Sequence, residues 1–453
     1  MSERADVVVV GMGPGGEYVA GRLAEAGLDV VGIDSGLVGG ECPYWGCIPS
    51  KMMIRAANLV AETRRVPGMA GASTVQPSWE PVARRIRDEA TDDWDDRVAV
   101  ERFEGKGGRF LRGAGRLAGP GRVEVGDTVV EAGRAVVLAT GTDASVPPVD
   151  GLSDVPYWTN HEAIAVAALP SSIVVLGGGA IGLELGQVFR RFGVEVTIVE
   201  ALDRLLAGEE PEAGALLAEV LEREGVSVRT SAKVARVRQD GATIALDLDG
   251  GSRVAAERLL VATGRAADLA ALGVESIGID PKARWLSVDD HLRVAPGVWA
   301  VGDITGAGAF THVAMYQAAI AVDDILGRDV APADYKALPR VTFTDPEVGS
   351  VGLSEAAARE RGLDVRAGMA RLPSSARGWI HKAGNEGFIK LVEDVRRGVL
   401  VGATSAGPTG GEVLGLLALA VHAEVPTAHL RRMIFAYPTF HRGVEDALRH
   451  MAH

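Results

Sequence analysis

Residues 7–16 read Val-Val-Val-Val-Gly-Met-Gly-Pro-Gly-Gly. The four β-branched residues predict a buried strand, and the glycine-rich run predicts a tight turn into a helix that ends near Ala26. A second strand is expected to end at Asp34. In such a pattern the first glycine permits the turn, the second lets a pyrophosphate approach the backbone, and the third lets helix and strand pack closely. The segment therefore predicts a strand–turn–helix–strand unit that binds a dinucleotide at the N-terminus of its helix.

The same pattern occurs a second time in the chain. Residues 173–182 read Ile-Val-Val-Leu-Gly-Gly-Gly-Ala-Ile-Gly, a helical stretch then runs to Phe192, and a strand ends at Glu200. Asp34 and Glu200 each lie 23 residues after the first glycine of their motif. An acid at this distance binds the ribose hydroxyls of a dinucleotide. One Gly-x-Gly-x-x-Gly motif is a weak signal, but two copies in the same context indicate two dinucleotide sites.

Each copy is followed by another apolar strand that ends in Ala-Thr-Gly. The first of these strands covers residues 136–141 and the second covers residues 259–264. Either one alone is typical of an ordinary strand-to-loop turn. Their matched positions favour two return strands, with Thr140 and Thr263 in loops that close over the two dinucleotides.

Length and charge limit the class of protein. A chain of 453 residues suggests about three domains. The net charge of −13 is spread along the chain with no basic stripe, which argues against nucleic acid and anionic membrane surfaces as partners. The first six residues carry no signal-peptide pattern, and the apolar stretch Val413–Val425 is too short to span a bilayer. We therefore expect a cytoplasmic protein with no membrane association.

The two cysteines, Cys42 and Cys47, lie five positions apart. Pro49 suits the first turn of a helix, which places Cys47 at a helix N-terminus, where the thiolate form is favoured. Gly46 permits a bend between the two cysteines. A structural disulfide is not expected in a reducing compartment. Two interpretations of the cysteines remain at this point, a redox-active pair and a pair of small buried apolar side chains.

The cysteine segment resembles one family closely. Residues 39–51 read Gly-Gly-Glu-Cys-Pro-Tyr-Trp-Gly-Cys-Ile-Pro-Ser-Lys. This resembles the pyridine nucleotide-disulfide oxidoreductases, the family of dihydrolipoamide dehydrogenase, glutathione reductase and mercuric reductase. Supporting matches are Val-Gly-Asp at 301–303 and Thr-His-Val-Ala at 311–314, and the resemblance covers nearly the whole chain. It implies an α/β fold with two Rossmann-like domains, for FAD and NAD, and a C-terminal α/β dimerisation domain that makes a homodimer.

The resemblance also implies a chemistry. Electrons from NAD(P)H would pass through FAD to a redox-active disulfide between Cys42 and Cys47. Cys47 would contact the flavin and Cys42 would meet the substrate. Lys51, paired with Glu184, would lie near flavin N5.

The resemblance assigns further residues by position. Asp34 would bind the adenosine ribose of FAD, and Asp303 would bind its ribityl chain. No metal site is expected. Catalytic roles are expected at Cys42, Cys47, Lys51, Glu184 and Tyr437. Cofactor binding is expected at Gly11, Gly13, Pro14, Gly15, Gly16, Asp34, Ser35, Gly40, Glu41, Gly46, Lys51, Ala139, Thr140, Gly141, Gly302, Asp303, Thr311, Gly177, Gly179, Ala180, Ile181, Gly182, Glu200, Thr263 and Gly264.

The choice of nicotinamide nucleotide depends on Glu200. A carboxylate at the end of the second strand accepts hydrogen bonds from both ribose hydroxyls of NAD and repels the extra phosphate of NADP. The sequence therefore predicts NADH rather than NADPH. Arg204 would weaken this preference if it faced the phosphate, but an arginine at this spacing is more often a solvated surface charge.

The substrate-facing part of the site departs from the family pattern. Disulfide reductases of the family carry a C-terminal His-Pro-Thr-x-x-Glu segment, in which the histidine and glutamate form a proton donor. Tyr437 and Arg442 replace these two residues, and a tyrosine is a poor proton shuttle at neutral pH. Tyr437 resembles mercuric reductase, yet the chain carries no C-terminal cysteine pair. His441 is an alternative proton donor by type, but its shift of one residue from the expected position would turn its side chain elsewhere. Pro-Tyr-Trp at 43–45 is bulkier than the usual family residues.

Three functions remain open. The first is an FAD-dependent, NADH-preferring reductase of an unidentified small-molecule acceptor, such as a quinone, a metal ion or an unusual disulfide. The second is a disulfide reductase with a relocated proton donor, and the third is a redox-sensing flavoprotein that acts through a protein partner. We expect an FAD-binding domain at 1–150, an NAD(P)-binding domain at 151–270, a central segment at 271–335 that completes the FAD site, and an interface domain at 336–453.

Overall fold

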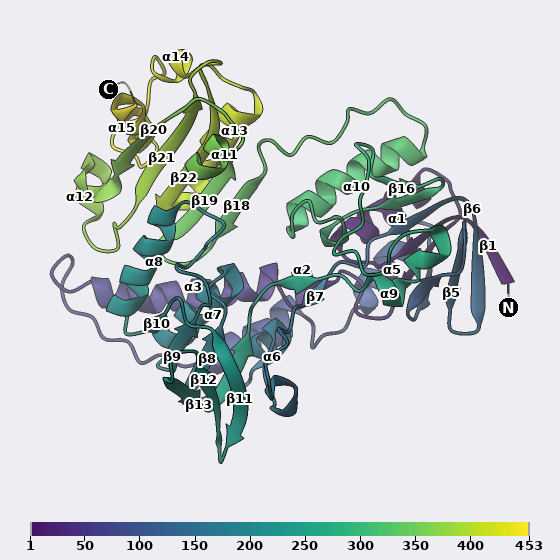
Figure 1. Ribbon diagram of the computed structural model, residues 1–453, viewed down its shortest axis with the longest axis horizontal. Coiled ribbons are helices and arrows are strands. Elements are labelled where there is room, and N and C mark those ends of the chain that lie inside the picture. The colour runs from purple at the N-terminus through teal and green to yellow at the C-terminus, as the bar shows by residue number, and fades with distance from the viewer. Residues whose placement is uncertain (1, 452–453) are drawn as a thin grey trace. The chain divides into compact units, whose positions relative to one another are not determined.

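The computed structural model describes residues 2–451. The chain divides into two compact units, each assembled from three separate segments. The first comprises Met1–Ser50, Ala83–Ser145 and Gly264–Asp334, and the second comprises Lys51–Val82, Val146–Thr263 and Tyr335–His453. Figure 1 labels many of the elements of both units.

The first unit is built on an eight-stranded sheet in the order β16-β17-β6-β1-β2-β3, in which β5 also pairs with β6, and β4 pairs with β5. β1 runs parallel to both of its neighbours, β2 and β6. The strands are β1 (Ser2–Val10), β2 (Val30–Asp34), β3 (Arg109–Arg112), β4 (Gly115–Leu117), β5 (Arg122–Val125), β6 (Thr128–Leu138), β16 (Arg293–Ala295) and β17 (Val298–Ala300). A separate two-stranded ladder joins β7 (Asp143–Ala144) and β15 (Arg265–Ala266).

Both faces of this sheet are buried. Successive residues of β1 point to opposite faces, so this strand contributes side chains to a core on each side. Val7 and Val9 enter a core covered by α1 and α10, while Val8 and Val10 enter a core on the other face. The helices that carry residues of this unit are α1 (Pro14–Glu25), α2 (Glu41–Tyr44), the start of α3 (Cys47–Arg65), the end of α4 (Glu80–Arg85), the π-helix Ile86–Ala90, α5 (Arg97–Glu104), α9 (Leu269–Leu272) and α10 (Thr311–Ile325).

The second unit contains another parallel sheet, in the order β10-β9-β8-β14. An antiparallel ladder, β11-β12-β13, completes this part. The strands are β8 (Ser172–Leu176), β9 (Glu195–Val199), β10 (Ser227–Arg229), β11 (Val234–Asp240), β12 (Thr243–Leu248), β13 (Arg253–Ala256) and β14 (Arg258–Val261). The helices are α6 (Asn160–Ala165), α7 (Ala180–Arg191) and α8 (Pro211–Arg223).

A five-stranded antiparallel sheet forms the C-terminal part of the second unit, in the order β18-β19-β22-β21-β20. Ile389 and Leu391 of β21 enter the core beneath α13 and α15, whereas Val392 packs with Ala358 of α11. The strands are β18 (Pro339–Thr342), β19 (Glu347–Gly352), β20 (Val365–Arg371), β21 (Phe388–Asp394) and β22 (Val399–Gly407). The helices are α11 (Glu355–Glu360), α12 (Ala376–His381), α13 (Gly410–His422), α14 (Thr427–Leu430) and α15 (Arg442–His450).

The α/β architecture is confirmed, with one mixed sheet whose central strands are parallel, one parallel sheet and a C-terminal α/β part. Both predicted strand–turn–helix–strand units are present, as β1-α1-β2 and β8-α7-β9. Within residues 2–451, no helix has the length and apolar composition needed to cross a membrane. The boundaries of the four domains proposed from the sequence stay a prediction.

Candidate active site

The first glycine of each repeat is required by the backbone. Gly11 and Gly177 have φ values of +94° and +116°, a region that residues with a side chain rarely adopt. A Cβ on Gly11 would also strike the carbonyl of Ala139, and one on Gly177 would strike the carbonyl of Ala262. Each glycine therefore lets its turn lie against the end of the return strand, β6 or β14.

The second glycine of each repeat is not required by the protein itself. Gly13 and Gly179 are the N-caps of α1 and α7, with φ values of −67° and −85° that any residue adopts. A Cβ on Gly13 would come no nearer than 4.0 Å to another atom, and one on Gly179 would meet nothing within 4 Å. The space in front of both helix N-termini is therefore open, which fits the close approach of a pyrophosphate group.

The acid that ends the second strand holds the glycine loop in both repeats. Asp34 accepts hydrogen bonds from the Met12 and Gly36 amides at 2.5 and 2.7 Å. Glu200 accepts hydrogen bonds from the Gly178 and Leu202 amides at 2.6 and 2.7 Å. Burial raises the pKa of Asp34, and the two amide hydrogen bonds oppose that rise. The two repeats thus present a carboxylate at equivalent places, as the sequence predicts.

The cysteine segment lies where two helices of the first unit begin. Cys47 is the first residue of α3, and its Sγ atom lies 3.4 Å from the Oγ1 atom of Thr311, the first residue of α10. Cys47 is exposed, and Cys42, in α2, is half-buried. The predicted position of Cys47 at a helix N-terminus is confirmed. Partial positive charge from a helix N-terminus favours a thiolate at this position.

Asp303 belongs to a cluster of charged and polar groups near the cysteine segment's Glu41. The Asp303 carboxylate accepts a hydrogen bond from the Thr142 hydroxyl at 3.0 Å. Arg265 donates to Thr142 and to Glu41, and its Nε atom lies 3.9 Å from Asp303 Oδ2. Burial raises the pKa of Asp303, while the charge of Arg265 acts against this rise.

Thr142 and Arg265 were not predicted as site residues, although the sequence contains a signal for both. Each directly follows one of the two Ala-Thr-Gly tripeptides, Thr142 after Gly141 and Arg265 after Gly264. The tripeptides end the return strands of the two repeats. β7 follows the first tripeptide and β15 follows the second. The pairing of these two strands brings the segments of Thr142 and Arg265 together.

Lys51 and Glu184 form the ion pair that the resemblance implied. The Lys51 Nζ atom lies 2.8 Å from Glu184 Oε2, and the ammonium lies 4.7 Å from the centroid of the Phe343 ring. The other carboxylate oxygen of Glu184 accepts the Phe343 amide at 2.8 Å. Glu184 is a buried residue of α7. Since each of its carboxylate oxygens has a partner, the carboxylate is held in one orientation.

Comparisons with known proteins decide the family. The model described as pyridine nucleotide-disulphide oxidoreductase matches residues 5–318, and the model of that family's dimerisation domain matches residues 338–448. The chain belongs to this family. It is an FAD-dependent NAD(P)H oxidoreductase and a flavoprotein with a disulfide redox centre.

Similar proteins of this family cover almost the whole chain. A dihydrolipoyl dehydrogenase of Thermus scotoductus is 33% identical over 461 residues, covering 98% of this chain and 96% of the relative. A mercuric reductase of Acidithiobacillus ferrooxidans is 32% identical over 453 residues, covering 97% of this chain and 81% of the relative. Among solved structures, the Cu(II) complex of the HOCl-induced flavoprotein disulfide reductase RclA from Escherichia coli has 25% identity, a TM-score of 0.87 and 99% coverage of both chains.

The C-terminal departure from the family's disulfide reductases is visible at Tyr437. Its side chain is 67% exposed, and the guanidinium of Arg442 lies over its ring at 5.2 Å from the centroid. Arg442 also pairs with Glu445 at 3.3 Å. His441, the alternative proton donor, is exposed at the N-cap of α15. The described part of this segment therefore offers an aromatic–guanidinium pair in place of a histidine–glutamate pair.

Trp94 is a third residue near the cysteine segment that the sequence did not predict. Its ring stacks on Trp45, between the two cysteines, with centroids 5.3 Å apart. Asp92, Asp93 and Trp94 all have left-handed φ values, between 49° and 57°, and the buried Nε1 atom of Trp94 has no hydrogen-bond partner within the described chain. Strained backbone of this kind concentrates at functional sites. No sequence pattern marked Trp94, because it meets Trp45 only through the tertiary fold.

Proposed function

We propose that this member of the family passes electrons from NADH to the Cys42–Cys47 pair, and from Cys42 to an acceptor other than the usual small disulfides. The observation that carries the proposal is the Cys47 thiol at the start of α3, beside Thr311 at the start of α10. In the net reaction, NADH, one proton and the disulfide give NAD⁺ and two thiols. The disulfide re-forms when an acceptor takes up two electrons.

The residues described above have separate tasks in this proposal. FAD, when bound, supplies the two-electron chemistry that links a nicotinamide to a disulfide. Asp34 and the open N-terminus of α1 would hold its adenosine ribose and pyrophosphate, and Asp303 would hold its ribityl chain. Lys51, fixed by Glu184, would bind at the flavin ring. Cys47 would face the flavin, and Cys42 would face the acceptor.

The preference for NADH is supported by the surroundings of Glu200. Its carboxylate would lie beside the ribose hydroxyls of the nucleotide and would repel a phosphate on that ribose. The guanidinium of Arg204 is engaged by other groups, since it donates to Asp203 at 3.2 Å and to the Ala207 carbonyl at 2.8 Å. We also propose a homodimer, which the match to the dimerisation-domain model supports, and a cytoplasmic location.

The identity of the acceptor depends on the substrate-facing side. Tyr437 and Arg442 stand where the family's disulfide reductases carry a histidine and a glutamate, so a departing thiolate lacks its usual proton donor. Reduction of a quinone or a metal ion releases no thiolate from the acceptor, and the two thiols of the enzyme give up two protons when their disulfide re-forms. The mercuric reductases among the relatives, and the copper(II) complexes of the similar disulfide reductase, support including metal ions in the acceptor panel.

Anaerobic titration of the purified holoenzyme tests the entry of electrons. NADH is expected to reduce the flavin and produce a long-wavelength charge-transfer band, and NADPH is expected to do so only at much higher concentration. Cys47→Ser should abolish the band, whereas Cys42→Ser should keep a thiolate beside the flavin. If NADH reduces the wild-type flavin and no band appears, the proposed contact of Cys47 is wrong.

Steady-state turnover tests the exit of electrons. The panel contains quinones, Hg²⁺, Cu²⁺, lipoamide and low-molecular-weight disulfides, each with NADH. We expect turnover with a quinone or a metal ion, its loss in Cys42→Ser, and slow turnover with lipoamide. Rapid lipoamide reduction by the wild type would contradict the argument from Tyr437 and Arg442.

A further inference from the structure

The loop 201–210 packs against the glycine-rich turn of the second repeat, residues 177–179, which is called the second glycine loop below. The Leu206 amide donates to the Gly178 carbonyl at 3.0 Å, and the Leu205 side chain lies where a Cβ on Gly178 would point. The Gly178 amide in turn donates to Glu200. The loop therefore touches Gly178 directly, one residue before the N-cap of α7.

The far end of the same loop is held by the C-terminal sheet. Arg340 of β18 binds both carboxylate oxygens of Glu209, with its Nε atom 2.8 Å from Oε1 and its Nη2 atom 3.0 Å from Oε2. The Ser350 hydroxyl of β19 adds a third hydrogen bond to Glu209, at 2.5 Å. A two-point contact between guanidinium and carboxylate fixes orientation as well as distance.

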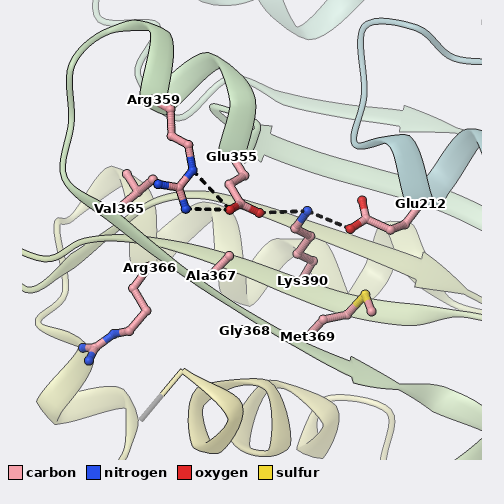
Figure 2. A pocket seen from close by; sticks show the side chains of 9 residues that line it. All are labelled: Glu212, Glu355, Arg359, Val365, Arg366, Ala367, Gly368, Met369 and Lys390. Carbon is pink, nitrogen blue, oxygen red and sulfur yellow. Dashed lines mark hydrogen bonds and ion pairs between the residues drawn. The ribbon is translucent and has the colours of Figure 1, made fainter. Parts of the chain in front are cut away.

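Lys390 holds the residue next to Glu209. Figure 2 shows its ammonium between Glu355 and Glu212. The ammonium lies 3.2 Å from Glu355, 2.8 Å from Glu212 and 2.9 Å from Glu210 Oε2. The side chains of Lys390 and Glu210 are 8% and 4% exposed. Burial by itself would lower the pKa of Lys390, but its hydrogen bonds to Glu212 and Glu210 outweigh burial and raise it. Lys390 is therefore a charged anchor at neutral pH.

A short chain of hydrogen bonds connects the two ends of the loop. The Glu209 amide donates to the Leu206 carbonyl at 2.8 Å, and the Leu206 amide donates to Gly178. Leu206 has a φ of +46°, a conformation that a leucine keeps only when its surroundings hold it. Release of Glu209 would let Leu206 relax and would free Gly178 from one of its contacts.

We propose that Glu209 and Arg340 are positioning residues for the second glycine loop, so that the C-terminal sheet sets the affinity for NADH. The inference rests on the proposed function in one respect, that the second glycine loop binds the nicotinamide nucleotide. Neither residue belongs to the repeat or to the cysteine segment. Both act through Leu206 and Gly178, and Lys390 assists by fixing Glu210.

The dissociation constant of NADH tests the inference in the holoenzyme. Arg340→Met and Glu209→Gln are each expected to raise this constant about tenfold, the scale of a typical coupling between distant groups. The KM for NADH should rise with it, while kcat at saturating NADH and the flavin absorbance spectrum stay unchanged. Arg340→Lys, which keeps the charge, should restore part of the affinity.

Arg223→Met is the matched control. Arg223 ends α8 and pairs with Glu386 at 2.6 Å, so it joins the same two parts of the second unit at a place far along the chain from Gly178. This variant should bind NADH as the wild type does, even if its free energy of unfolding falls. Equal weakening of NADH binding by Arg223→Met and Arg340→Met would show a general loss of stability and overturn the inference.

A double-mutant cycle completes the test. If Glu209 and Arg340 act through one contact, the double variant Arg340→Met, Glu209→Gln should bind NADH no more weakly than the worse single variant. Unchanged affinity in both single variants would also overturn the inference. Failure of the proposed function would be seen separately, because the wild-type flavin would then not be reduced by NADH.

Discussion

At the scale of single residues, Glu184 uses its two carboxylate oxygens for two different contacts. One oxygen accepts from Lys51 and the other from the Phe343 amide. A glutamine in this place can satisfy only one of these donors with its carbonyl, and its NH₂ group would face the other. The carboxylate therefore holds the Lys51 ammonium and the Phe343 amide at the same time, which a neutral residue of the same shape cannot do.

Glu184→Gln is expected to slow flavin reduction by NADH about 10- to 100-fold, because loss of a hydrogen bond to a charged group costs about 1.5–3 kcal/mol. Stopped-flow absorbance of the flavin under anaerobic conditions measures this rate. Glu222→Gln, on the exposed side of α8, serves as the control and should reduce at the wild-type rate. A wild-type rate in Glu184→Gln would remove the Lys51–Glu184 pair from the mechanism.

At the scale of elements, β1-α1-β2 and β8-α7-β9 are the same device used twice. Each has a left-handed first glycine, an open N-cap glycine and an acid that binds the loop from the next strand. The two devices lie in different units and share the same physical features. Equivalent substitutions should therefore have equivalent effects on two different cofactors.

Gly13→Ala should weaken FAD binding, and Gly179→Ala should weaken NADH binding while FAD is retained. A new methyl group would meet the ligand and no protein atom, so each loss should be about tenfold or more, since overpacking a close contact costs about 1–3 kcal/mol. Flavin content after dialysis and NADH titration measure the two affinities. Gly415→Ala, in α13, also meets nothing within 4 Å and is the control. Loss of FAD in Gly179→Ala would contradict the separation of the two sites.

At the scale of the whole molecule, features that depend on local spacing were predicted from the sequence far better than contacts between distant segments were. The glycine repeats, the helix start at Cys47 and the acids at Asp34 and Glu200 are short-range patterns, and the structure contains all of them. Thr142 meets Asp303 across 161 positions of the chain, and Glu209 meets Arg340 across 131. The position of Thr142 after Ala-Thr-Gly marks that residue, but no local pattern marks its partner or the Glu209–Arg340 contact, because only the packed fold brings these segments together.

The largest exposed apolar side chains of the C-terminal part indicate how the chain assembles. Ile434 is 95% exposed and Trp379 is 73% exposed, and both lie within the match to the dimerisation-domain model. We propose that both side chains lie in the interface of a homodimer, since association sites are rich in exposed apolar surface. Tyr437, on the same segment as Ile434, would then take its place in the site of the other copy, as the resemblance to the family implies.

Ile434→Asp is therefore expected to convert the homodimer to monomers, because a carboxylate buried in an apolar interface loses its hydration. Sedimentation equilibrium measures the change. Val98→Asp, an equally charged change at an exposed site on α5, should leave the dimer intact. The monomer should still reduce its flavin with NADH, since both glycine loops and the Cys47 segment belong to one chain, but it should lose turnover with the acceptor. Acceptor turnover that persists in the monomer would show that Tyr437 of a second copy is not part of the exit route.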